Sequence, residues 1–149
     1  MKTAISIGLI GFLFLFGSKI KLLDATAQEW VGGIQASGYG TNYKLTLKAR
    51  GDNEVFQVDE IWIGEDYFEV SAKKNLANRS DQTYSKKDTV YVNVSVNLKP
   101  DGKGGMKKVG VSTKAKPKEY EGVGLLGYSW KGKKKYFVIR DVRKLQKLI

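Results

Sequence analysis

Side chains that could bind an anion are concentrated in the last third of the chain. Residues 103–149 contain 14 basic and 3 acidic residues, a net charge of +11, whereas residues 29–102 contain 9 basic and 11 acidic residues, a net charge of −2. Basic and aromatic residues alternate closely in one C-terminal segment: Tyr128, Trp130, Lys131, Lys133, Lys134, Lys135 and Tyr136. Because ammonium groups attract phosphate, sulfate and carboxylate groups, this segment predicts a binding surface for an anionic partner.

The partner that these charges predict is an anionic polysaccharide, another envelope polymer or a membrane surface. The same electrostatic field would hold nucleic acid without reading its sequence, so no specific nucleic acid is expected for an exported protein. A simpler interpretation is that lysines on the outward face of strands keep a sheet soluble and protect its edges. Exposed charge contacts contribute only about 0–1 kcal/mol each, so binding requires many of them to converge. The oligomeric state is left open.

Acidic residues in the middle of the chain raise two other chemistries. They are Asp52, Glu54, Asp59, Glu60, Glu65, Asp66 and Glu69. Two carboxylates facing one cleft could hydrolyse a glycoside, and oxygen ligands at Asp52 or Glu65 could bind Ca²⁺, although neither segment matches a full calcium loop. Since Asp and Asn are common in turns, we interpret these residues as turn residues.

The chain contains no histidine and no cysteine. The commonest general base, the commonest metal ligand and all thiol chemistry are therefore missing. We expect no metal, no cofactor and no enzyme activity, with a small carboxylate-based hydrolase as the alternative.

The first 27 residues are typical of a secretory signal peptide. Lys2 precedes an uncharged run at residues 4–17, and Ala25-Thr26-Ala27 matches the small-x-small pattern that a signal peptidase prefers. The run is shorter than the roughly 20 residues that span a bilayer. We expect cleavage near Ala27, which leaves a secreted, periplasmic or cell-envelope domain of residues 28–149. An uncleaved N-terminal membrane anchor is the alternative.

Strands must position all of these side chains. Residues 89–98 carry their large apolar side chains on one parity: Val90, Val92, Val94, Val96 and Leu98. Such alternation predicts a strand with one buried face, and β-branched residues favour strands. Each buried valine contributes roughly 1.5–3 kcal/mol, so a second apolar layer must cover this face.

Similar patterns predict further strands along the chain, at residues 29–37, 43–50, 55–63, 67–72, 107–116, 122–130 and 133–141. The first of these is interpreted as an irregular edge strand, and residues 73–87 as a long surface loop. Val142, Leu145 and Leu148 are spaced as in one or two helical turns.

Two local irregularities carry specific predictions. Phe56 and Val58 share one parity while Ile61 and Ile63 share the other, so a β-bulge at Asp59-Glu60 is expected to return both pairs to the core. Lys131-Gly132 is expected to form a two-residue hairpin loop, with a positive φ at the glycine. Trp62, between Ile61 and Ile63, is expected to pack in the core or at an edge.

These strands predict an antiparallel β-sandwich of about eight strands, with a small closed barrel as the alternative. The expected function is a non-catalytic binding or scaffolding module of the cell envelope, with a barrel-type carrier of an apolar ligand or a hydrolase as alternatives. A carrier should contain a cavity of about 300 Å³ or more, lined by Phe68, Tyr128 and Trp130. A hydrolase should hold two carboxylates about 5–10 Å apart across a cleft.

Overall fold

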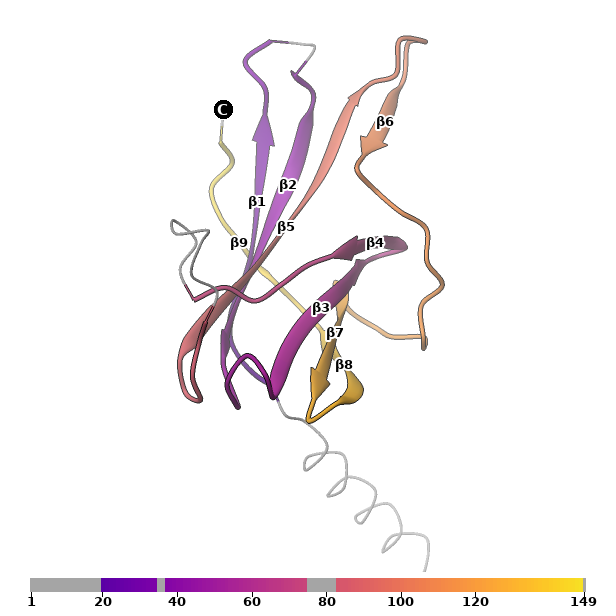
Figure 1. Cartoon of the computed structure of the whole chain (residues 1–149). Helices are drawn as coiled ribbons and strands as arrows, with labels where there is room; N and C mark the ends of the chain where they lie inside the picture. Colours follow the sequence, from indigo (N-terminus) through magenta and orange to yellow (C-terminus); the bar gives the residue numbers. More distant parts are fainter. Residues whose placement is uncertain (1–19, 35–36, 75–82, 149) are drawn as a thin grey trace, which may run out of the picture.

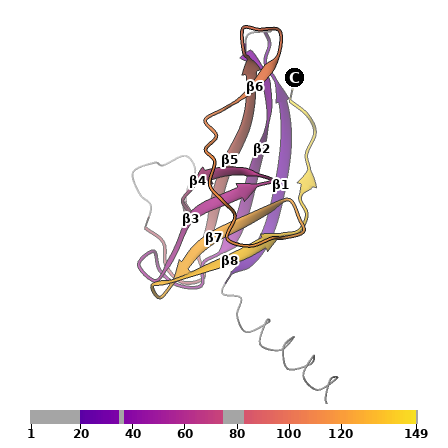
Figure 2. The same cartoon turned by 90° about the vertical axis from the view of Figure 1, so that its right-hand side faces the viewer.

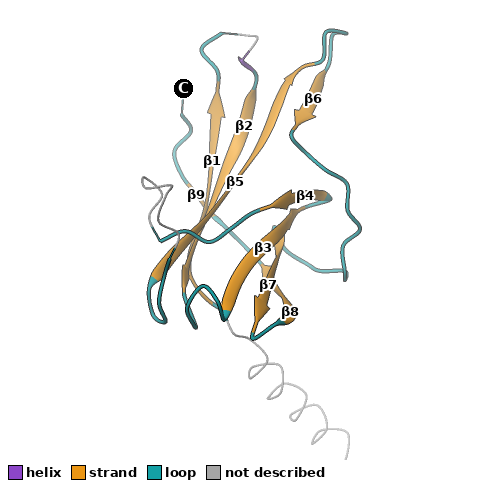
Figure 3. Ribbon diagram, viewed as in Figure 1, coloured by secondary structure: helices purple, strands orange, loops and turns teal. Residues whose placement is uncertain are grey.

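The computed structural model describes residues 20–34, 37–74 and 83–148. In these residues, strands joined by loops form two sheets that pack face to face (Figure 1, Figure 3). The strands are β1 (Lys21–Val31), β2 (Tyr39–Lys48), β3 (Phe56–Ile63), β4 (Asp66–Glu69), β5 (Thr89–Pro100), β6 (Met106–Val109), β7 (Gly124–Trp130), β8 (Lys133–Ile139) and β9 (Arg143–Lys144). One sheet has the order β6-β5-β2-β1-β9 and the other β4-β3-β7-β8. The predicted all-β sandwich is confirmed, and within the described residues the sheets do not close into a barrel.

The valine-rich strand β5 lies in the interior of the five-stranded sheet, as its alternation predicts. Val90 and Val92 are fully buried, and they pair with Leu47 and Leu45 of β2, which are equally inaccessible. Ala25 of β1 continues this apolar row beside Leu45. The row supplies one half of the core.

The other half of the core comes from the four-stranded sheet. Phe56 and Ile61 of β3 are fully buried against Tyr128 of β7, with the rings of Phe56 and Tyr128 in an edge contact at 5.7 Å between centroids. The register of β3 against β7 shifts between Val58 and Glu60, which confirms the predicted bulge. One extra residue returns the alternation of β3 to the core side.

The N-terminal strand differs from the prediction in length and position. The edge strand expected at residues 29–37 begins instead at Lys21 and ends at Val31, and it lies between β2 and β9. The alternation that marks it is weak because residues 25–27 are all small side chains buried in the sheet. Part of the expected loop, residues 75–82, falls outside the described residues, as does most of the expected leader.

The C-terminal tail forms a strand and not the helical turns that its spacing suggested. Arg143 and Lys144 pair in parallel with Thr26 and Ala27 of β1, and the amide of Leu145 donates to the carbonyl of Ala27 at 2.9 Å. The edge of β1 pairs with the tail between Thr26 and Val31, whereas an isolated helix this short is unstable in water. The tail therefore follows the sheet edge.

The segment between β6 and β7, residues 110–123, crosses the outer face of the four-stranded sheet, and we call it the strap (Figure 2). It was predicted in part as a continuation of a strand, but β6 ends at Val109. Ser112 pairs with Tyr67 of β4, and the Tyr120 hydroxyl donates to the carbonyl of Gly64 at 2.9 Å. Under the strap Trp62 is 1% exposed, as the core interpretation predicted.

Candidate polyanion-binding surface

The β7–β8 hairpin ends in a tight turn that places lysines at its tip. Lys131 and Gly132 both have positive φ, 49° and 80°, the combination of a type I′ turn, whose twist matches that of the flanking strands. Trp130 and Lys133 form the closing pair. The predicted hairpin loop is confirmed, and Lys131 and Lys133 are exposed on either side of its glycine.

Two other loops lie against this hairpin tip. The amide of Lys131 donates to the carbonyl of Val55 in the β2–β3 loop at 2.9 Å. That loop is joined in turn to the start of β5, because the amide of Lys87 donates to the carbonyl of Ala49 and the amide of Ala49 to that of Asp88, both at 2.8 Å. The three connections therefore occupy one end of the sandwich, the lower end in Figure 1.

Basic residues from four separate parts of the sequence meet at this end. Lys21 at the start of β1 pairs with Lys48 at the end of β2, which adds two more charges to those of the loops. We call the following set the basic end: Lys21, Lys48, Arg50, Lys86, Lys87, Lys131 and Lys133. Acidic residues at this end are Asp52, Glu54 and Asp88, and Asp88 is paired with Lys74 at 3.4 Å. The end thus carries a positive excess.

The seven residues predicted from the sequence are only partly brought together. Tyr128 is 1% exposed and packs in the core, so it does not contribute to a surface. Tyr128 shares its parity in the strand with Leu126, and this alternation was the sequence signal that could have placed Tyr128 in the core. Trp130 is half-buried beneath the hairpin tip, with the Lys131 ammonium 5.5 Å from its ring centroid.

Lys134, Lys135 and Tyr136 leave the hairpin tip along β8. Lys134 forms ion pairs with Asp59 and Glu60, and its ammonium lies 5.9 Å from the ring centroid of Tyr136. Lys135 and Tyr136 are half-buried. Of the predicted set, Lys131 and Lys133 are therefore exposed at the tip and form no ion pair with any described residue.

The charge contrast along the sequence is partly cancelled in space. Lysines of β6 and the strap pair with the acidic residues of β3 and β4 and of the turn between them. The pairs are Lys108 with Asp66 at 2.8 Å, Lys114 with Glu60 at 2.9 Å and Lys116 with Glu65 at 2.7 Å. These lysines hold the strap on the sheet, so they contribute little to a binding surface. The basic residues of the basic end from the first half of the chain were missed because no local pattern marks them.

Glu60 is the centre of the ion pairs beneath the strap. Its carboxylate is buried and accepts hydrogen bonds from Lys114 and Lys134 at 2.9 Å and from the Tyr67 hydroxyl at 3.1 Å. Burial acts to raise the pKa of Glu60, but the two ammonium groups outweigh it and the pKa is lowered. A side chain at Gly127 would collide with Glu60, since an added Cβ would lie 2.5 Å from Cγ of Glu60. The carboxylate is thus ionised and fully engaged.

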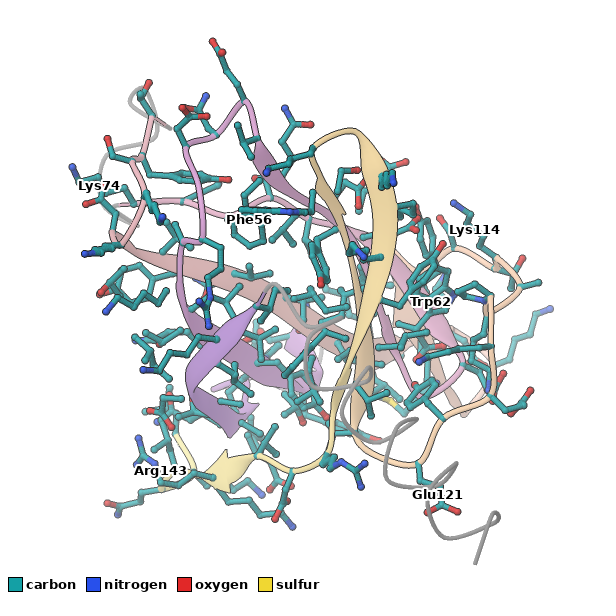
Figure 4. The ribbon with its side chains drawn as sticks, turned by 90° about the horizontal axis from the view of Figure 1, so that it is seen from below. Phe56, Trp62, Lys74, Lys114, Glu121 and Arg143 are labelled. Atoms are coloured by element: carbon teal, nitrogen blue, oxygen red, sulfur yellow. The ribbon has the colours of Figure 1, made fainter. Side chains whose placement is uncertain are left out.

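The neighbouring aromatic residues complete this structural cluster (Figure 4). The indole of Trp62 donates to the carbonyl of Lys114 at 2.9 Å, and Lys114 lies 4.9 Å from the ring centroid of Tyr67. Burial and the adjacent Glu60 raise the pKa of Tyr67. A phenol with a raised pKa and a carboxylate with a lowered pKa are poor acid–base partners at neutral pH. The arrangement therefore has the features of a structural clamp.

An open groove of about 700 Å³ lies at the opposite end, where β1, β2 and β5 extend beyond the other sheet (Figure 1). Tyr39 and Tyr43 line one wall, and Ile63 lines the other. Glu29 and Asp66 line it from opposite sheets. Burial, with a further contribution from Glu29, raises the pKa of Tyr43.

This groove differs from the cavities predicted for a carrier or a hydrolase. Phe68, Tyr128 and Trp130 pack in or against the core and are not among its described lining residues. Asp66 forms an ion pair with Lys108. Among the described lining residues, Glu29 therefore has no unpaired carboxylate opposite it across the groove.

Residues 20–34, 37–74 and 83–148 contain neither a candidate metal site nor a candidate membrane-spanning helix. No three Asp or Glu side chains there lie close enough to hold a metal ion. No helix in the same residues is long and apolar enough to cross a membrane.

Comparison of the chain with protein-family models, with curated proteins and with solved structures gives no match in any of the three.

Proposed function

We propose that this domain is a non-catalytic binding module of the cell envelope that holds an anionic partner at its basic end. The observation that carries the proposal is that backbone hydrogen bonds join three connections at one end of the sandwich. These connections carry Arg50, Lys86, Lys87, Lys131 and Lys133. Lys108, Lys114 and Lys116 form ion pairs with acidic residues of β3, β4 and the turn between them. The five residues at the basic end named above form no ion pair with any described residue. A set of converging, exposed cations attracts a polyanion more strongly than the same charges spread over the surface.

The chemistry of the partner follows from the side chains. Lysine ammonium groups act as point charges, and they recognise repeated phosphate, sulfate or carboxylate groups without a fixed geometry. Arg50 adds a planar donor group that matches such oxyanions with two hydrogen bonds. The partner is therefore a polymer or surface with regularly spaced negative groups, and its binding should weaken with salt because exposed charges are screened over about 8–10 Å at physiological ionic strength.

Salt elution from a sulfated-dextran resin tests the proposal. We expect purified protein carrying Lys131→Gln and Lys133→Gln to elute at a clearly lower salt concentration than a control carrying Lys103→Gln and Lys107→Gln. Both double variants lose two positive charges, but the control lysines are exposed near β6, at the far end of the sandwich (Figure 1). Equal shifts would show that only the net charge matters, which would refute a binding end.

Two further experiments distinguish a lipid surface from a soluble polymer as the anionic partner and test the loops of the basic end. Co-sedimentation with vesicles rich in phosphatidylglycerol, against pure phosphatidylcholine, detects recognition of a lipid surface. Retention on the soluble polymer without vesicle binding would assign the basic end to a polysaccharide or another envelope polymer. A variant with Arg50→Gln and Lys87→Gln tests the loops separately, and the proposal requires it to weaken binding as the hairpin variant does.

The groove supports a second candidate function, which is binding of a small ligand with an apolar part. Its volume of about 700 Å³ is in the range of ligand sites, and Tyr39 is 44% exposed within it. The fluorescence of anilinonaphthalene sulfonate, an apolar dye, would report occupancy. Tyr39→Ser should reduce the dye signal if the groove is the site, and an unchanged signal would exclude the groove.

A further inference from the structure

We propose that the small-residue motif Ala25-Thr26-Ala27 is a structural part of β1 and not the leader-processing site, so that the exported protein keeps β1 whole. The sequence pattern alone favours cleavage after Ala27. The structure places this motif inside a sheet, where its small side chains have a packing role. The proposal is independent of the anionic partner at the basic end.

The motif is among the most enclosed parts of the strand. Ala25, Thr26 and Ala27 are 7%, 6% and 8% exposed, and Ile20 before them is 5% exposed in the core. Ala25 belongs to the hydrophobic core, and Thr26 and Ala27 are also enclosed, so small side chains at these positions fit the packing of the sheet. The same residue types that a peptidase prefers are therefore explained by packing.

The backbone pairing of β1 also supports an intact strand. Between Lys21 and Ala27, β1 pairs with the Tyr43–Lys48 half of β2 in antiparallel register. On its other side, Thr26 and Ala27 pair with β9, and Asp24 binds the Arg143 guanidinium at 2.8 Å. Removal of residues up to Ala27 would leave only Gln28 to Val31 of this strand.

The consequences of such a cut are specific. Leu45 and Leu47 of β2, which are 1% and 0% exposed, would lose the strand that flanks them. Unpaired amides and carbonyls along β2 would form an open sheet edge, which is prone to aggregation. β9 would lose Thr26 and Ala27, the residues of β1 with which it pairs, and the tail would keep only its described contacts with Gln28 to Val31 of that strand. A domain beginning at Gln28 would therefore lack part of both its core and its sheet.

Processing upstream of Ile20 avoids these losses. Gly17 ends the apolar run at residues 4–17, and Ser18 directly follows it, so two small residues stand at this point. A cut beside them would remove the run and leave Lys19 and all of β1 with the domain. We expect the exported protein to begin near this point.

N-terminal sequencing and intact mass of the exported protein test the proposal. A first residue before Lys21, or an uncleaved chain, supports it, because β1 is then complete. A first residue of Gln28 in folded, monomeric protein overturns it.

A second measurement does not depend on export. Chains of residues 20–149 and 28–149 can be made without a leader and unfolded in urea. We expect a single cooperative transition for the longer chain and loss of that transition for the shorter one, accompanied by aggregation. Equal midpoints for the two chains would also overturn the proposal.

Discussion

Replacement of Glu60 by glutamine tests the clamp that holds the strap on the four-stranded sheet. The substitution keeps the shape of the side chain and removes its charge. Glu60 accepts hydrogen bonds from Lys114, Lys134 and Tyr67, and its residue is 5% exposed. The change therefore weakens the bonds to both ammonium groups at once.

The expected loss of stability is modest. A hydrogen bond to a charged group contributes about 1.5–3 kcal/mol, and glutamine retains one acceptor oxygen. The side chains of Lys114 and Lys134 are 54% and 33% exposed, so both ammonium groups can turn to water once the carboxylate is gone. The loss is then below the 3–5 kcal/mol that follows when a charge is left buried. We expect about 1–2 kcal/mol at pH 7, measured by urea unfolding.

The pH dependence provides a sharper test. The pKa of Glu60 is lowered from its ordinary value of 4.5, so the folded state favours the ionised carboxylate. Its contribution is fully present above pH 4.5 and is lost as the pH falls through the lower folded pKa. The difference between wild type and Glu60→Gln should therefore be constant near neutrality and shrink below pH 4.5.

Glu121→Gln is the matched control. Glu121 is exposed, points away from the sheets in Figure 4 and forms no ion pair within the described part of the chain. Its substitution should leave the free energy of unfolding unchanged within error. A Glu60→Gln protein as stable as this control at pH 7, or one whose deficit does not shrink in acid, would refute the clamp.

Two other substitutions test contacts that position the strap and the core. Burial raises the pKa of Tyr84 to about 12, with a further contribution from Asp52, and its hydroxyl donates to the carbonyl of Phe56. The folded state favours the neutral phenol, so its contribution to the free energy of unfolding should be fully present below pH 10 and be lost as the pH rises toward 12. Urea unfolding curves of Tyr84→Phe should show a smaller loss of stability over the same pH range. Trp62→Phe removes the donor to the carbonyl of Lys114 and should speed tryptic cleavage in the strap, while cleavage at an unchanged rate would show that this hydrogen bond does not hold the segment.

Much of the fold was predictable because side-chain parity in a strand is local. The alternation of β5 placed Val90 and Val92 in the core, and the change of phase in β3 located the bulge beside Glu60. The hairpin turn at Lys131-Gly132 followed from the conformational freedom of glycine. Each of these conclusions depends on a few neighbouring residues and on no distant contact.

The N-terminal strand and the tail were not predictable in this way. Ala25, Thr26 and Ala27 are small on both faces of β1, so they carry no alternation and instead match a processing motif. Arg143 and Lys144 form a strand only because the side of β1 is there to pair with them. The tail depends on a partner more than 100 positions away in the sequence.

The sequence by itself determined the class of fold, the buried faces of the clearest strands and the excess of positive charge, since each depends on composition or local periodicity. Only the tertiary structure decided which positive charges are paired with carboxylates. Lys108, Lys114, Lys116 and Lys134 pair with carboxylates that lie 42 to 75 positions away, because the strap and β8 are brought onto β3, β4 and the turn between them. Folding cancels those charges and gathers others at the basic end, for the physical reason that Coulomb energy depends on distance in space and not along the chain.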